Sequence, residues 1–291
     1  MTARFQRFAG GGLAALAAIM LLAGPAFADR YKGSLKDAPK PEERCKHSAN
    51  VALATEYVFR GFSQTAQGPA VQGGYDLTCG IFYAGVWASN LDFAGTWPGF
   101  SADVTGAPYD ASIEMDWYVG VKPVTGKITW DLGVIYYSYP SAFNPGLNLN
   151  YFEIKVGASA EIWKDGTLGV TVFWSPEYQL ESGSTFTVET GFTQVFPKIH
   201  ALHREWTPSF SALLGWQTNE GTASYQFSYG NGDDSYLYWN AGVSLGFLEK
   251  WSLDFRYWDT NLGSNAGGSA FCKLPTFQCD ERFVATLKFT Y

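Results

Sequence analysis

Strict alternation between apolar and polar residues is the feature that most limits how this chain can fold. Over residues 152–162, apolar side chains alternate with polar or small ones that include Glu153, Lys155, Ser159 and Glu161. A helix would spread these polar residues around its circumference, whereas a β-strand places all of them on one face. The segment is therefore predicted to be a strand with one apolar face and one charged face.

The same alternation recurs along the chain, most clearly in residues 112–121 and 282–291. Twelve segments reach the roughly 9 to 11 residues that a tilted membrane strand needs. We expect strands near residues 49–61, 69–79, 81–93, 111–122, 128–140, 150–163, 167–179, 186–197, 207–219, 236–248, 251–262 and 280–291. Ten or fourteen strands are the alternatives, the latter if residues 223–229 pair as a further strand.

The connections between these segments alternate in length. Short ones lie at residue 80 and at residues 123–127, 164–166 and 249–250, and long ones at residues 94–110, 221–235 and 264–278. Short periplasmic turns and longer outer loops are typical of bacterial outer-membrane barrels. The connection at residues 198–206 is longer than its periplasmic position predicts.

Composition supports a membrane barrel over a soluble β-protein. Aromatic residues make up 17% of the chain and charged residues 16%, against about 25% charged residues in a typical soluble domain. A secreted β-sandwich or soluble barrel would explain the alternation, but it would bury its apolar face and leave few charges inside. We therefore expect an all-β, antiparallel transmembrane β-barrel over residues 49–291.

The N-terminus has the pattern of an export signal. Arg4 and Arg7 precede an apolar run at residues 13–23, and the small-residue triplet Ala26-Phe27-Ala28 follows. This order predicts a cleaved signal peptide over residues 1–28, a periplasmic linker over residues 29–48 and a place in the bacterial outer membrane. The formal net charge of -7 and the lack of a basic patch argue against a nucleic-acid partner.

Two early segments resemble a known family. The opening of the TorF-type porin family is similar to residues 50–65, 68–70 and 72–76 of this chain. Its next segment is similar to the stretch Phe82-Tyr83-Ala84-Gly85-Val86-Trp87-Ala88-Ser89-Asn90. The resemblance is specific over about the first hairpin and a half. It implies an outer-membrane barrel and a pore, and it brings no catalytic residues.

The polar face of each predicted strand would line the lumen. The charged candidates are Glu56, Arg60, Asp76, Glu114, Asp116, Asp131, Glu153, Lys155, Arg256 and Arg282. Such charges either pair across the lumen and close it, or line a wet channel that selects ions. Glu56 and Arg60 are expected on the inner face of the first strand with Asp76 beside them, as a charged constriction or an ordinary ion-pair network.

Four cysteines are expected to form two disulfides in an oxidising compartment. The strand map places Cys45 and Cys79 at the periplasmic rim, whereas Cys272 and Cys279 flank the last outer loop. We therefore predict the pairs Cys45–Cys79 and Cys272–Cys279, with no metal site.

The sequence favours a pore and not an enzyme. His47, His200 and His203 all map to the periplasmic side, away from any serine nucleophile at the outer rim. We expect passive diffusion of small hydrophilic solutes or ions, a weak cation preference from the excess of inward acids, outer-membrane lipid as the partner and no cofactor. The alternative is a closed structural or partner-binding barrel without conductance.

Overall fold

The computed structural model describes residues 45–93, 111–140, 142, 148–219, 235–262 and 279–291. The chain divides into two compact units, Met1–Glu43 and Arg44–Tyr291, and the described residues all belong to the second. Its elements are β1 (Lys46–Ala54), β2 (Val58–Phe59), β3 (Phe62–Ser63), β4 (Ala70–Cys79), β5 (Phe82–Asn90), β6 (Ile113–Val121), β7 (Val124–Thr125), β8 (Ile128–Ser138), β9 (Tyr151–Trp163), β10 (Gly166–Ser175), the 3-10 helix η2 (Gln179–Glu181), β11 (Thr185–Val195), β12 (Ile199–Ala201), β13 (Arg204–Asn219), β14 (Ser235–Phe247), β15 (Trp251–Thr260) and β16 (Arg282–Thr290).

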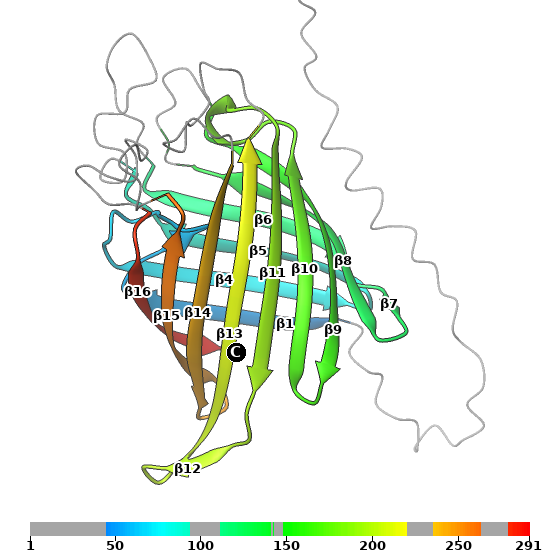
Figure 1. Ribbon diagram of the computed structural model, residues 1–291, viewed down its shortest axis with the longest axis vertical. Helices are drawn as coiled ribbons and strands as arrows, with labels where there is room; N and C mark the ends of the chain where they lie inside the picture. Colours follow the sequence, from blue (N-terminus) through cyan, green and yellow to red (C-terminus); the bar gives the residue numbers. More distant parts are fainter. Residues whose placement is uncertain (1–44, 94–110, 141, 143–147, 220–234, 263–278) are drawn as a thin grey trace, which may run out of the picture. The chain divides into compact units, whose positions relative to one another are not determined.

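The strands form one closed antiparallel barrel (Figure 1). The main sheet has 14 strands, of which β7 and β12 are short hairpin arms outside the wall. The remaining twelve follow one another around the wall in chain order, and the pairing of β1 with β16 closes the ring. The predicted all-β barrel of twelve strands is confirmed. Residues 223–229, the proposed extra strand, lie outside the described residues.

The two faces of the wall differ as the alternation predicts. In β9, Phe152, Ile154 and Val156 are exposed on the outside, whereas Glu153 between them is buried inside. A closed barrel pairs every wall strand on both sides, so an apolar exterior can meet lipid without exposing backbone groups. No helix among the described residues is long and apolar enough to cross a membrane.

One rim carries the short turns and both ends of the barrel sequence. The connection that was predicted to be unusually long extends there as a hairpin, in which β12 pairs with the first residues of β13 (Figure 1). Aromatic rings gather at the same rim, with Trp206 on Phe247 at 5.1 Å and Trp251 on Phe289 at 5.1 Å between ring centroids. Amphipathic aromatic rings prefer the membrane–water boundary, so these rings mark one edge of the apolar band. The short turns at this rim assign it to the periplasmic side.

The first strand is shorter than its sequence pattern suggests. The strand predicted over residues 49–61 begins at Lys46 and ends at Ala54, and residues 55–69, here called the inner hairpin, fold into the barrel. Within the inner hairpin, β2 and β3 form a separate two-stranded sheet. Its tip is a tight turn in which Arg60 and Gly61 have φ values of 48° and 87°. Glycine adopts this left-handed region without a steric penalty, so Gly61 favours the reversal.

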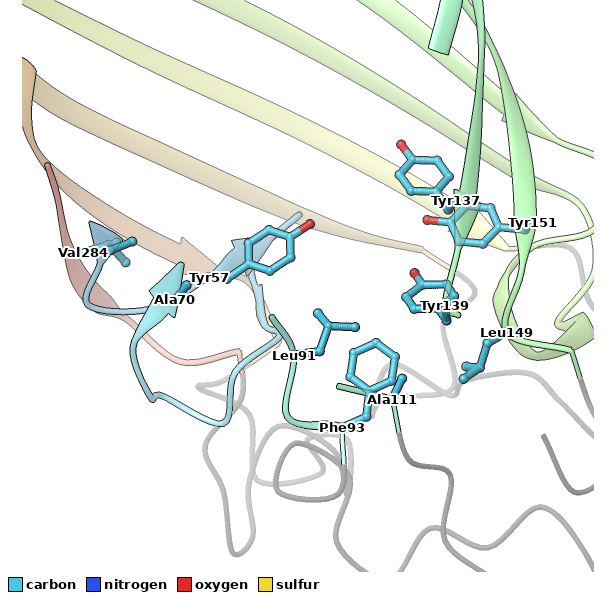
Figure 2. Packing of buried hydrophobic residues seen from close by; sticks show 11 residues of the cluster. Tyr57, Ala70, Leu91, Phe93, Ala111, Tyr137, Tyr139, Leu149, Tyr151 and Val284 are labelled. Carbon is cyan, nitrogen blue, oxygen red and sulfur yellow. The ribbon is translucent and has the colours of Figure 1, made fainter. Parts of the chain in front are cut away.

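The inner hairpin packs into a buried cluster at the outer end of the barrel. Tyr57 lies in the cluster with Leu91, Phe93, Tyr137 and Tyr139 from the barrel wall and its outer connections (Figure 2). The rings of Tyr137 and Tyr151 stack at 4.4 Å between centroids. Apolar and aromatic side chains therefore fill the outer end of the lumen.

One of the two predicted disulfides lies in the described part of the chain. Cys45 and Cys79 are joined by a disulfide, as predicted, and it links the start of β1 to the end of β4 at the periplasmic rim. Cys272 lies outside the described residues, so the Cys272–Cys279 pair stays a prediction. Mass mapping of the non-reduced protein would test it.

Candidate functional site in the barrel lumen

The tip of the inner hairpin places a charged side chain across the lumen. Arg60 donates two parallel hydrogen bonds to Glu153 on β9, from Nη1 to Oε1 and from Nη2 to Oε2, each 2.8 Å long. Charge-assisted pairs with this fork geometry are among the strongest polar contacts in proteins. The pair therefore ties the tip of the hairpin to the opposite wall of the barrel.

Other wall residues also contact the Arg60 guanidinium, although its buried Nε lacks a hydrogen-bond partner among the described residues. Nη1 also donates to Gln217 Oε1 at 3.3 Å, and the guanidinium carbon lies 5.0 Å from the centroid of the Phe173 ring. An arginine guanidinium keeps its proton in proteins, and here the Glu153 carboxylate lies directly beside it. Arg60 is therefore charged while it fills the lumen.

The same wall residues are held in place by further hydrogen bonds. The hydroxyl of Tyr137 donates to Glu153 Oε2 at 3.0 Å, and that of Thr187 donates to Gln217 Oε1 at 3.2 Å. The Tyr236 hydroxyl donates to the backbone oxygen of Arg60 at 3.0 Å. These contacts come from β8, β11 and β14, so several strands hold the hairpin tip, either directly or through Glu153 and Gln217.

The base of the inner hairpin is held by a second set of charged contacts. Arg282 Nη1 donates to Glu56 Oε1 at 2.6 Å, and the Tyr57 hydroxyl donates to Glu114 Oε1 at 2.7 Å. Glu114 lies on β6, at the outer end of the barrel wall. We call this region, from the inner hairpin to the level of Glu153, the outer half of the lumen.

Below this level the inward charges form separate clusters. Lys155 Nζ lies 2.9 Å from Asp131 Oδ2, and the Tyr83 hydroxyl donates to Asp131 Oδ1 at 2.7 Å. Lys122 Nζ is 3.8 Å from the same carboxylate. The Tyr118 hydroxyl donates to Asp76 at 2.5 Å. We call this region the periplasmic half of the lumen.

A matching cluster occupies the facing wall of the periplasmic half. Arg256 donates to Asp254 at 3.0 and 3.1 Å, to Asn240 Oδ1 at 2.6 Å and to Ser211 Oγ at 2.8 Å. The strands that carry these residues, β13 to β15, lie across the ring from β6 and β8. Both clusters therefore contain a base paired with an acid on the barrel wall.

Solvent exposure separates the two halves. The side chains of Arg60 and Glu153 are 4% and 1% exposed, whereas those of Arg256 and Asp254 are 19% and 21% exposed. Ion pairs of the same type are therefore dry in the outer half and in contact with water in the periplasmic half.

The structure also shows which predicted neighbours meet. Glu56 and Arg60 are not on the inner face of the first strand as predicted, because β1 ends at Ala54, and Asp76 contacts Tyr118 instead of either of them. Asp116 is mostly buried, and its Oδ1 lacks a hydrogen-bond partner among the described residues.

Sequence reasoning missed the uncharged partners of the lumen charges. Tyr137, Gln217 and Tyr238 bind Glu153, Arg60 and Glu189, respectively. The available signal was their inward position on alternating strands. Gly61 within a strand pattern also indicates a break, which would have suggested the turn at the hairpin tip.

The described residues give little support for catalysis or metal binding. His200 pairs with Glu205 at 3.1 Å on the periplasmic hairpin, His203 lies in its turn, and His47 contacts Tyr75 at the same rim. The part of the chain that the structure describes holds no group of three His, Cys, Asp or Glu residues arranged for a metal ion. That the chain is not an enzyme stays a prediction.

An antiparallel barrel with an apolar exterior and a charged interior is a transmembrane β-barrel of the outer-membrane type. The chain belongs to the family described as a bacterial protein of unknown function, Gcw_chp, whose model matches residues 38–291. The description of this family does not name the TorF-type porins. No curated protein matches the sequence.

Several solved barrels are similar in structure. The NanC porin has 8% sequence identity and a TM-score of 0.48, and the match covers 83% of this chain and 98% of that chain. The KdgM porin has 9% identity and a TM-score of 0.46, with 84% and 99% covered. LpxR from Salmonella typhimurium has 10% identity and a TM-score of 0.42, with 84% and 99% covered. At these TM-scores, the likenesses identify neither a function nor a solute.

Proposed function

We propose that the protein is a porin of the bacterial outer membrane through which small hydrophilic solutes and ions diffuse passively. The observation that carries this proposal is the hydrated, charged interior of the periplasmic half, where Arg256, Asp254, Lys155 and Asp131 are all partly exposed inside the barrel. Charged side chains in contact with water inside a barrel are typical of a channel lining. The resemblance to the TorF-type porin family supports the same function.

A weak preference for cations belongs to this proposal. Arg256 is paired with Asp254, and Asp131 lies between Lys155 and Lys122, so together these two clusters carry one excess positive charge. Asp76 and Glu189 instead accept hydrogen bonds from tyrosine hydroxyls, and neither forms an ion pair among the described residues. The field of the lumen is therefore negative, and it raises the local concentration of cations modestly.

The closed barrel is the second candidate, and the inner hairpin favours it. Arg60 and Glu153 are almost completely buried, and aromatic side chains fill the space around Tyr57. A barrel that keeps this packing at all times cannot conduct.

Conductance of the refolded full-length mature protein in planar bilayers distinguishes the two functions. We expect rare, small steps from the wild type and steady, larger steps when residues 58–63 are replaced by a short Gly-Ser turn. The matched control replaces residues 199–204 in the periplasmic hairpin, which lies outside the lumen and should leave conductance unchanged. A folded barrel without the inner hairpin that shows no steps would rule out the pore.

We also infer that residues 1–28 are removed on export and that residues 29–48 act as a periplasmic linker. The pattern of Arg4, Arg7 and the apolar run at residues 13–23 supports the cleavage. N-terminal sequencing of the protein isolated from outer membranes should begin at Asp29.

A further inference from the structure

The Arg60 side chain contacts the barrel wall from an element that is not itself part of the wall. Its guanidinium is separated from its main partners by 93 and 157 positions in the sequence, at Glu153 and Gln217. The hairpin that carries it belongs to a separate two-stranded sheet that forms no ladder with the barrel wall. Movement of the tip would break its contacts with Glu153, Gln217 and Tyr236, but none of the strand pairs that close the barrel.

The wall that receives Arg60 is a formed site on rigid strands. Glu153 on β9 presents both carboxylate oxygens, Gln217 on β13 presents its amide oxygen, and Phe173 on β10 presents a ring face. Tyr137 holds the carboxylate from β8, and Thr187 holds the amide from β11. Sites held by neighbouring hydrogen bonds on strands keep their geometry when the ligand departs.

The geometry of this site fits a guanidinium group in particular. Two parallel N–H donors match the two oxygens of a carboxylate, and a planar cation stacks on an aromatic face. A primary ammonium is a point charge and cannot make the paired contact. Asp116 on β6 also lies in the outer half, and its Oδ1 is an acceptor that lacks a partner among the described residues.

We propose that Glu153, Tyr137 and Gln217 form a recognition site for the guanidinium group of a solute, which Arg60 occupies as an internal ligand until the solute displaces it. This inference rests on the proposed function as a porin and names its preferred solute class. A solute that binds only when the inner hairpin has moved shifts the population toward the open barrel. The contact between a guanidinium group and Glu153 would thus close the lumen when Arg60 makes it, and would favour the open barrel when a solute makes it.

The test is the open fraction of single channels with arginine as the probe. Arginine and lysine are compared at equal concentration and ionic strength in both chambers. Arginine should raise the open fraction of the wild type by roughly tenfold, whereas lysine should change it by less than about twofold. An equal response to the two would show that charge alone acts, and it would overturn the guanidinium site.

Charge exchange between Arg60 and Glu153 tests the internal ligand without removing a side chain. Arg60→Glu should raise the open fraction about 30-fold, because inverting the charge of one partner of a buried ion pair removes the attraction that holds the hairpin in the lumen. Combining it with Glu153→Arg should restore closure but abolish the response to arginine. Arg204→Gln, in the periplasmic hairpin outside the lumen, is the matched control and should keep the arginine response.

Folding is checked for each variant by its heat-dependent mobility in detergent gels and by circular dichroism, and only folded barrels are compared. If the inner-hairpin deletion conducts but arginine has no effect on the wild type, the guanidinium site is wrong and the porin function stands. If no folded variant conducts, the porin function itself is wrong. Failure of the double exchange to restore closure would overturn the role of Arg60.

Discussion

The two halves of the lumen use the same residue types in opposite ways. In the outer half, Arg60 and Glu153 form a nearly dry pair that joins the inner hairpin to the wall. In the periplasmic half, Arg256 and Asp254 pair along one strand in contact with water. The difference shows that a polar strand face does not by itself make a channel, because the segment that enters the barrel decides where water remains.

The electrostatic consequences of the two environments also differ. A buried pair keeps much of its Coulomb energy because little water screens it, but each partner has lost its hydration. A hydrated pair is screened, and its loss is partly compensated by water. The three predictions below compare equivalent changes in the two halves.

The largest expected effect is the insertion of an inward arginine. Thr187 is fully buried in the outer half, so Thr187→Arg overfills the space and buries an unpaired charge. We expect a loss of about 3 to 5 kcal/mol in the free energy of unfolding. Ser159→Arg, inward in the periplasmic half, should cost about 1 kcal/mol or less because its charge reaches water. Urea unfolding in lipid vesicles measures both.

The neighbouring wall position gives a reference for the lipid-facing side. Ala158→Arg should cost about 2 to 4 kcal/mol, since it places a charge in the apolar band. Equal losses at Thr187 and Ser159 would mean that the two halves are equally packed. A loss at Ser159 as large as that at Ala158 would mean that the faces of β9 are assigned wrongly.

The second effect is smaller and concerns single hydroxyl groups. Tyr137→Phe removes a hydrogen bond to the buried Glu153 carboxylate and should reduce the free energy of unfolding by about 1.5 to 3 kcal/mol. Tyr118→Phe removes the equivalent bond to Asp76, but water can replace it in the periplasmic half. We expect about 1 kcal/mol or less there, and a larger loss at Tyr118 than at Tyr137 would reverse the comparison.

The smallest effect is on ion selectivity. Asp131→Asn leaves Lys155 and Lys122 without their acidic partner, so the reversal potential in a salt gradient should move toward anions. A unit charge at about 8 Å in water corresponds to about 0.5 kcal/mol, or a roughly twofold change in permeability ratio. Glu114→Gln, in the outer half behind Tyr57, is expected to shift selectivity less while the inner hairpin is in place. The opposite order would place the selective region in the outer half.

Much of the barrel could be predicted from the sequence because its determinants are local. Alternation sets which face of a strand each side chain occupies, so Glu153 is inside and Val156 outside whatever the rest of the chain does. The strand map also brought Cys45 and Cys79 to one rim, and the structure joins them. Strand number and order followed from the same pattern together with the turn lengths.

The candidate site was predicted only in part. Arg60 and Glu153 were both expected inside the barrel, but on separate strands of an ordinary lining. Glu56 and Arg60 fall on the polar face of the predicted strand, and Tyr57 and Phe59 fall on its apolar face, so the sequence pattern does not show that the strand ends at Ala54. Only the turn at Gly61 hinted that the chain reverses there.

The sequence by itself therefore determined the wall, and the tertiary structure decided the lumen. A strand's period is a property of neighbouring residues, and it survives in any barrel that hides charges from lipid. Whether residues 55–69 continue the wall or enter the lumen depends on the hydrogen-bond partners of Arg60, Glu153 and Gln217, which are more than 90 positions away in the sequence. These partners come together only after the barrel has closed, because the strands that carry Glu153 and Gln217 meet the inner hairpin across the ring.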